Sequence, residues 1–319
     1  MRENRQPIRA LLILTALTVG IITLFMSLNV RGQWDFILTF RGTKVLTMAL
    51  VGYAIAVSTV LFQTVSHNRI LTPSIMGFDQ LYILIQTSLV FTIGSAGLTA
   101  LDPRLLFAFN VGAMVVFSTA LYRWLFSGSS RSLHLLVLVG IVFGVLFRSL
   151  SSFMQRIIDP NEFVVLQDRL FANFNTIDSN LLGIAVATIL IASFFGWRLM
   201  HVYDVLALGR EASINLGLDH GRIVTVILML VAVLVSVSTA LVGPVTFFGL
   251  LVANLAYGIA GTHKHRFVLP VATLLAVICL IGGQLILERV FAFDTALSIV
   301  IEFVGGIVFL ALLIRGVAR

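Results

Sequence analysis

The chain has 319 residues, of which 59% are hydrophobic and only 11% are charged. A soluble domain is roughly half apolar and about a quarter charged, so this composition excludes a soluble globular protein and predicts a polytopic all-α membrane protein. The formal net charge of +7 does not indicate a nucleic-acid partner, because the basic residues stand singly at the ends of apolar runs, where they orient helices in membrane lipid. One cysteine, Cys279, excludes an intrachain disulfide.

The apolar pattern, cut at charged and turn residues, predicts about ten spanning helices of roughly twenty residues each. The N-terminal run resembles a signal peptide but has no cleavage pattern, so we expect a retained helix. The whole chain, residues 1–319, therefore forms one transmembrane domain. The predicted spans are 8–28, 42–65, 74–97, 104–126, 133–156, 179–200, 222–241, 248–261, 267–290 and 296–315.

An even number of spans places both termini on one side of the membrane. Basic residues are more frequent on that side and acidic residues on the other, which predicts cytoplasmic termini. The same count places segment 204–222 in the cytoplasm, and Asp79 with it. Loop 157–178, which carries Asp159, Glu162 and Asp168, faces outward.

Segment 204–222 is the longest polar interruption in the apolar pattern. Small, apolar and polar residues from Ala207 to Leu216 recur at helical spacing, and Gly217 stops the pattern. We expect one or two short helices at the membrane face. Their apolar stripe is covered either by a partner in water or by the bundle itself, and the sequence leaves both open.

Several kinds of chemistry are missing from the sequence. The two lysines, Lys44 and Lys264, do not follow glycine, so the chain has no Gly-x-x-x-x-Gly-Lys loop for ATP. No His-Glu-x-x-His pattern or other metal motif is present, and a membrane enzyme has no acid–base cluster to support it. Only Arg148 and Glu302 lie well inside predicted spans; they pair, pack or line a polar path. So few charges argue against an ion-coupled secondary transporter, which remains the alternative function.

Two glycine patterns concern backbone geometry. The run from Gly243 through Pro244 and Phe247 to Gly249 interrupts the apolar pattern between the seventh and eighth spans. It predicts either a half-inserted segment or a plain outer turn. Gly140 and Gly144, four residues apart on one span, permit close packing of another element.

Five motifs in chain order resemble the FecCD family, the permease subunits of ATP-binding-cassette (ABC) importers for iron siderophores and vitamin B12. They are Arg41-Gly-Thr-Lys44 with Gln63, Leu71-Thr-Pro-Ser-Ile-Met-Gly77, Ala207-Leu-Gly-Arg-Glu-Ala-Ser-Ile-Asn-Leu-Gly217, the Gly-Pro segment Val242–Asn254, and Gly261-Thr-His-Lys-His-Arg266.

The resemblance implies a type II ABC importer permease fold in the bacterial inner membrane. It implies a second permease subunit, more often a paralogue than an identical copy, and two cytoplasmic ATPases. Those ATPases bind ATP and Mg, so this chain has no cofactor. An extracytoplasmic binding protein would deliver a ferric siderophore, of the catecholate type in the subgroup that the chain resembles most.

The resemblance also implies roles for named residues. Four positions depart from the family pattern. Asn68-Arg-Ile stands where the family has Asn-Pro-Leu, and Ala253-Asn254 where it has Pro-His. Arg210 stands where the family has an acid, and Lys44 where it has an arginine, which grips carboxylates better. The residues implied to couple to the ATPase are Ala207, Leu208, Gly209, Arg210, Glu211, Ala212, Asn215, Leu216 and Gly217; those implied to dock the binding protein are Arg41, Lys44 and Arg289; those assigned to the translocation path or to packing are Gln63, Arg148, Gly243, Pro244, Phe247 and Glu302.

Overall fold

The computed structural model describes residues 5–28, 34–126, 133–175, 177–290 and 296–314, and within these ranges every regular element is a helix. The elements are α1 (Arg5–Ser27), α2 (Trp34–Ser66), the 3₁₀ turn η1 (Pro73–Met76), α3 (Phe78–Ala100), α4 (Pro103–Phe126), α5 (Leu133–Gln155), α6 (Pro160–Leu170), α7 (Ser179–Arg198), α8 (Met200–Leu206), α9 (Arg210–Asn215), α10 (His220–Val242), α11 (Phe248–Ala260), α12 (His265–Arg289) and α13 (Leu297–Ile314).

Each of the ten predicted spans corresponds to one apolar helix. Among the described residues, eight helices are long and apolar enough to cross a membrane, and Phe248–Ala260 and Leu297–Val308 are shorter apolar helices. The largest boundary error is in α2, which begins at Trp34 rather than at 42 and so includes Arg41 and Lys44. The all-α polytopic fold is confirmed, and the count of about ten is approximate.

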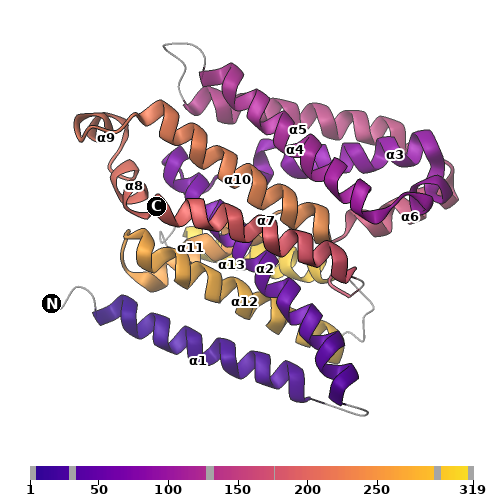
Figure 1. Cartoon of the computed structure of the whole chain (residues 1–319), viewed down its shortest axis with the longest axis horizontal. Coiled ribbons are helices and arrows are strands. Elements are labelled where there is room, and N and C mark those ends of the chain that lie inside the picture. Colours follow the sequence, from indigo (N-terminus) through magenta and orange to yellow (C-terminus); the bar gives the residue numbers. More distant parts are fainter. Residues whose placement is uncertain (1–4, 29–33, 127–132, 176, 291–295, 315–319) are drawn as a thin grey trace.

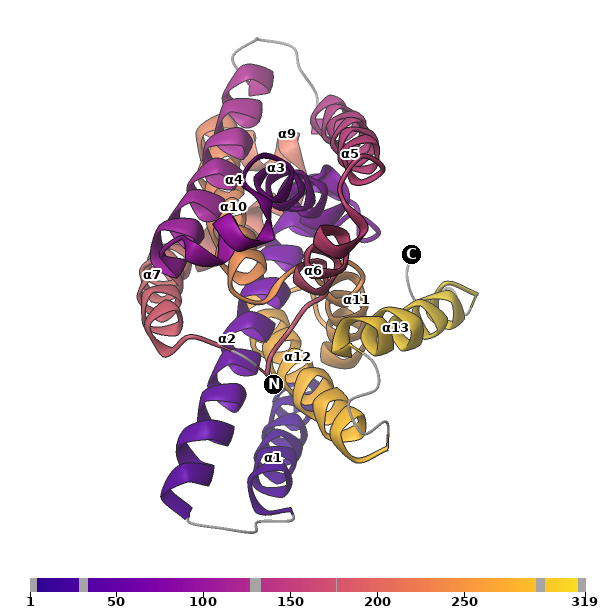
Figure 2. The same cartoon turned by 90° about the vertical axis from the view of Figure 1, so that its right-hand side faces the viewer.

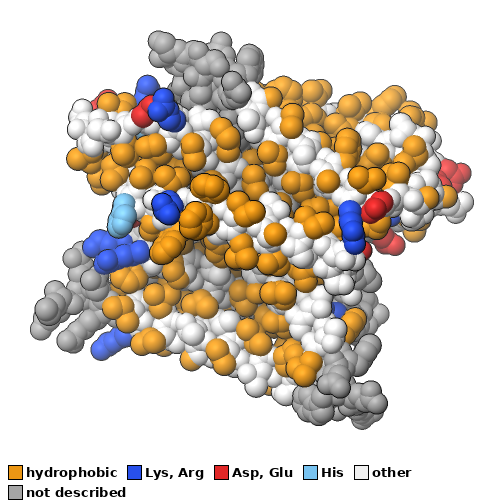
Figure 3. Space-filling view, viewed as in Figure 1, with side chains coloured by type: hydrophobic (Ala, Val, Ile, Leu, Met, Phe, Trp, Pro, Cys, Tyr) orange, Lys and Arg blue, Asp and Glu red, His pale blue; other side chains and the backbone are white. Residues whose placement is uncertain are grey.

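Helices α2, α10 and α12 form the core of the bundle. Helix α2 packs against both of the others, while α1 lies at the edge against α12, and α4 and α7 lie against α10 (Figures 1 and 2). Small residues permit the close contact: a side chain at Gly52 in α2 would begin 3.2 Å from Leu280 of α12. The face shown in Figure 3 is largely hydrophobic between two ends that carry charged side chains, as expected of a surface solvated by lipid.

The predicted loop 157–178 contains a helix that the sequence analysis missed. Asp159 caps α6 by accepting a hydrogen bond from the Asn161 N–H at 2.9 Å, and Pro160 occupies the first turn. Glu162 also accepts from the Ser95 N–H, where α3 breaks at Gly94. An Asp-Pro pair followed by an acid in the first turn is a helix-start signal, so this element was predictable.

The 3₁₀ turn η1 packs against the middle of α5. Gly77 has a φ of 93°, and a side chain on it would begin 3.0 Å from the Gly144 Cα. A side chain on Gly140 would meet Met76 at the same distance. The predicted close approach at Gly140 and Gly144 is confirmed, and its partner is η1 of the same chain. Helix α3 therefore starts deep inside the bundle.

The segment between α10 and α11 is also inserted. Gly243, Pro244 and Val245 are buried, and the Asn173 N–H donates to the Val242 carbonyl at 2.8 Å. The 13 residues of α11 extend about 20 Å, too short to cross a hydrocarbon layer of about 30 Å. The burial of this segment and the short length of α11 support the half-inserted alternative over the plain outer turn.

Candidate functional site

Two short helices, α8 and α9, form the segment that joins α7 to α10. They lie at the end of the bundle where α1 begins and α13 ends (Figure 1). The helical spacing predicted from Ala207 to Leu216 is interrupted at Gly209, whose φ of 103° breaks the chain direction between the helices. Gly217, with a φ of 87°, ends the second helix as predicted.

Three apolar side chains of this segment are exposed, although Leu206 of α8 is buried. Leu208 is 64% exposed, Leu216 is 61% exposed and Ile214 is 48% exposed. A helix resting on its own bundle would bury these residues, so the alternative of an uncovered apolar stripe is the one that the structure supports. The other predicted coupling residues Ala207, Arg210, Glu211, Asn215 and Gly217 are also exposed, and Gly209 and Ala212 are half-buried.

Helix α8 is fixed to the core by a chain of hydrogen bonds. One Asp204 carboxylate oxygen accepts from the His265 backbone N–H at 2.8 Å and lies 2.7 Å from His265 Nδ1. His265 Nε2 lies 2.6 Å from the Thr64 hydroxyl of α2. The buried Tyr203 hydroxyl donates to the Gly196 carbonyl, and burial raises the pKa of this phenol. The exposed leucines thus sit on an element that is joined to α2 and α12.

Helix α9 has its own anchor. The side chain of Ser213 is buried and its hydroxyl donates to the Arg210 carbonyl at 2.8 Å. The same hydroxyl lies 2.9 Å from His220 Nδ1, at the start of α10. The sequence analysis did not predict these contacts, in which His220 and His265 each tie this segment to a spanning helix.

A small polar pocket of about 290 Å³ lies beside α8. Within it, the Gln63 amide donates to the Arg69 carbonyl at 2.7 Å, and Asn254 donates to the same carbonyl at 3.1 Å. Of the two roles predicted for Gln63, packing is the one that this geometry supports: it holds the turn between α2 and η1.

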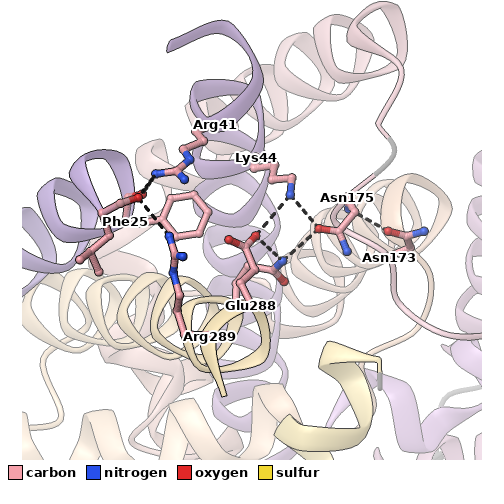
Figure 4. A network of polar contacts seen from close by, with 9 residues as sticks. Phe25, Arg41, Lys44, Asn173, Asn175, Glu288 and Arg289 are labelled. Atoms are coloured by element: carbon pink, nitrogen blue, oxygen red, sulfur yellow. Dashed lines mark hydrogen bonds and ion pairs between the residues drawn. The ribbon is translucent and has the colours of Figure 1, made fainter. Parts of the chain in front are cut away.

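The opposite end of the bundle carries a buried polar network around Lys44 (Figure 4). The Lys44 ammonium lies 3.3 Å from a Glu288 carboxylate oxygen and donates to Asn175 Oδ1 at 2.9 Å. The Gln284 amide donates to the same two acceptors at 2.9 and 3.0 Å, and the Asn175 N–H donates to Asn173 Oδ1. The network joins α2 and α12 to the loop before α7.

Arg41 and Arg289 satisfy backbone carbonyls at the end of α1. Arg41 Nη1 donates to the carbonyls of Phe25 and Leu28, each at 2.8 Å, and Arg289 donates to the Leu28 carbonyl at 3.0 Å. The last carbonyls of a helix have no partner within the helix, so these arginines cap α1. All three predicted docking residues thus have partners within the chain, and their docking role stays a prediction.

The interior holds an acidic residue that the sequence analysis placed wrongly. Asp79 is buried, beside the hydroxyls of Ser74 and Thr246, with Glu302 nearby. The sequence analysis places Asp79 on the cytoplasmic side, but η1 runs into the bundle and carries Asp79 with it. Its position inside the predicted span 74–97 was the available signal.

Arg148 lies on α5 and Glu302 on α13. Arg148 is exposed and Glu302 is half-buried, and no ion pair between them exists in the described residues. The alternative that they pair is therefore wrong. Among the other residues assigned to the translocation path or to packing, Phe247 is 44% exposed, whereas Gly243 and Pro244 are buried.

Comparison with known proteins supports the same assignment as the motifs. The petrobactin import system permease protein YclO of Bacillus subtilis is 48% identical over 303 residues, 95% of this chain and 96% of YclO. FatC, a permease protein of the petrobactin import system of Bacillus anthracis, is 38% identical over 86% of this chain and 78% of its own length. YclN, named as a second permease protein of the Bacillus subtilis petrobactin system, is 24% identical over 86% of this chain and 84% of YclN.

A solved structure of a metal-chelate type ABC transporter in an inward-facing conformation shares the fold. Its TM-score is 0.83 at 21% identity, covering 97% of this chain and 99% of that one. These relatives are permeases, so the chain is a transport component and the membrane-enzyme alternative is wrong. The model of the FecCD transport family matches residues 8–315. The chain belongs to the FecCD transport family.

Proposed function

We propose that the chain is the permease subunit of an ABC importer that carries a ferric siderophore across the bacterial inner membrane. The observation that carries this proposal is the α8–α9 segment, whose exposed Leu208 and Leu216 sit on an element hydrogen-bonded to the core. A chain without its own phosphate loop needs such a surface to receive work from a separate ATPase. Petrobactin is the first candidate substrate, because it is named for both YclO and FatC.

The partners follow from the same reasoning. Two ATPases that bind ATP and Mg would dock on α8–α9, which places this end and both termini in the cytoplasm. A binding protein would dock at the opposite end, near Arg41 and Arg289. The second permease would be a paralogue rather than an identical copy, because the Bacillus subtilis system has a second named permease, YclN, that is only distantly similar to this chain.

The test is reconstitution in proteoliposomes with the paralogous permease, the ATPase and the binding protein. We expect uptake of ferric petrobactin that requires ATP hydrolysis and the binding protein. A matched complex in which residues 207–217 are replaced by a Gly-Ser linker should assemble the bundle but lose uptake. Uptake by this chain driven by an ion gradient without the ATPase would instead establish the secondary transporter.

A further inference from the structure

An apolar groove of about 850 Å³ opens on the side of the bundle. Helix α7 packs on α10, α1 packs on α12, and α2 contacts all four of these helices. The groove is lined by α1, α2, α7, α10 and α12, through residues that include Val57, Leu190, Leu234 and Leu269. This side of the molecule is largely hydrophobic (Figure 3), so the groove faces lipid.

Most polar side chains in the groove wall are hydrogen-bonded within the protein. The Tyr53 hydroxyl donates to Ser193 Oγ at 2.8 Å, and Ser193 donates to the Ile189 carbonyl. The Thr273 hydroxyl donates to the Leu269 carbonyl at 3.0 Å. The wall therefore recognises an apolar occupant by shape, and water gains little by entering it.

Two arginines flank the end of the groove nearest α8. Arg198 stacks over Phe194 at 5.1 Å and follows Trp197, and both aromatic residues line the groove. Arg266 lies four residues before Pro270 and seven before Thr273, so it shares the helix face that lines the groove. Both arginine side chains are exposed, at the depth where the 70% exposed Trp197 marks the membrane interface.

We propose that this groove binds an anionic phospholipid, with one acyl chain along the apolar wall and the phosphate between Arg198 and Arg266. Lipid tails are as apolar as the wall, so the acyl chain is held by packing, and the headgroup charge supplies selectivity. Basic sites between helices on the cytoplasmic side suit such headgroups. The proposal needs only that the chain lies in a membrane, so it does not depend on the siderophore function.

The experiment is native mass spectrometry of the purified, delipidated protein titrated with dioleoyl phosphatidylglycerol or dioleoyl phosphatidylcholine. We expect phosphatidylglycerol to bind about tenfold more tightly, because two guanidinium groups face its charge. The variant Arg198→Gln with Arg266→Gln should bind both lipids equally. Thr273→Phe, which fills the groove, should weaken binding of both lipids, and Leu190→Trp provides a second groove-filling variant.

The matched control is Arg222→Gln, because Arg222 is an exposed arginine at the same end that already pairs with Asp219 at 3.5 Å. It should keep the preference for phosphatidylglycerol. Unfolding temperatures in lipid-free detergent establish that each variant is folded. Equal binding of the two lipids by the unchanged protein, or a preference that survives loss of both arginines, would overturn the proposal. So would unchanged binding in both groove-filling variants.

Discussion

The α8–α9 end exposes leucines, whereas the opposite end turns lysine and arginine side chains toward its own backbone and carboxylates. Leu208 and Leu216 are both more than 60% exposed, while Lys44 is buried against Glu288 and Asn175. Both ends are polar interruptions of an apolar sequence. Their difference shows that residue type at a helix end does not settle whether a side chain serves a partner or the fold.

The reason lies in what each end must satisfy. At the Lys44 end, the last carbonyls of α1 and the buried Glu288 need donors, and Arg41, Arg289 and Lys44 supply them. At the α8–α9 end, Asp204 and Ser213 hold the segment to the bundle through their contacts with His265 and His220. The leucines are not used for this and stay exposed. The following predictions test this contrast.

The largest effect should follow from charging the exposed leucines. Leu208→Asp with Leu216→Asp should lower ATP-driven uptake by about 100-fold, because buried apolar anchors dominate docking free energies. The free energy of unfolding should change by less than about 0.5 kcal/mol, because both side chains are exposed. Uptake assays and thermal unfolding measure the two quantities. The control variant, Leu208→Met with Leu216→Met, keeps the apolar surface and should transport. If it loses as much uptake as the aspartate variant, the leucines are not part of the docking surface.

The next largest effect concerns the buried polar network around Lys44. Lys44→Met should lower the free energy of unfolding by about 3 kcal/mol, because it leaves the Glu288 carboxylate buried without its partner. Adding Glu288→Gln should recover part of the loss, since a neutral amide needs no counter-charge. Thermal unfolding in detergent of the unchanged protein, the two single variants and the double variant gives the coupling free energy between Lys44 and Glu288. Equal losses in the single and double variants would contradict a structural ion pair.

The anchor of α8 should matter less for global stability and more for local order. Asp204→Ala removes the acceptor of two His265 N–H groups and should cost about 2 kcal/mol. Hydrogen–deuterium exchange should rise in residues 200–217 while α10 stays protected. Exchange that rises evenly across the bundle would mean that Asp204 supports the whole fold rather than this segment.

The predicted docking role of Arg41 and Arg289 can be tested separately from their role in capping α1. Arg41→Glu with Arg289→Glu should weaken binding-protein affinity by about tenfold at low salt, with the difference shrinking as salt rises. The matched glutamine pair removes the same caps without adding negative charge. If both pairs lose affinity equally at every salt concentration, the arginines act by shaping α1 and not by docking.

The smallest effect is a pH dependence near α8. Partial burial lowers the pKa of His67 below its ordinary value of 6.5. The folded protein therefore disfavours the protonated ring, and this contribution to stability is complete above pH 6.5 and decreases as the pH falls below it. The unfolding temperature should fall slightly more between pH 7 and pH 5 in the unchanged protein than in His67→Gln. Parallel curves would show that His67 does not contribute.

Much of the fold could be predicted because lipid imposes simple demands. The long apolar runs had to become helices, since no other open structure satisfies its backbone in hydrocarbon. Short elements were harder. Helix α6 is short and mixes apolar with polar residues, so the search for long apolar runs missed it although Asp159-Pro160 signalled its start.

The sequence by itself determined the class of protein, the approximate spans and, through its motifs, the family. Only the tertiary structure decided which polar residues are internal. It carried Asp79 into the bundle, separated Arg148 from Glu302, and gave Arg41, Lys44 and Arg289 partners from distant helices. The physical reason is that hydropathy reports transfer to lipid residue by residue, whereas a buried charge is stabilised by neighbours far away in the chain.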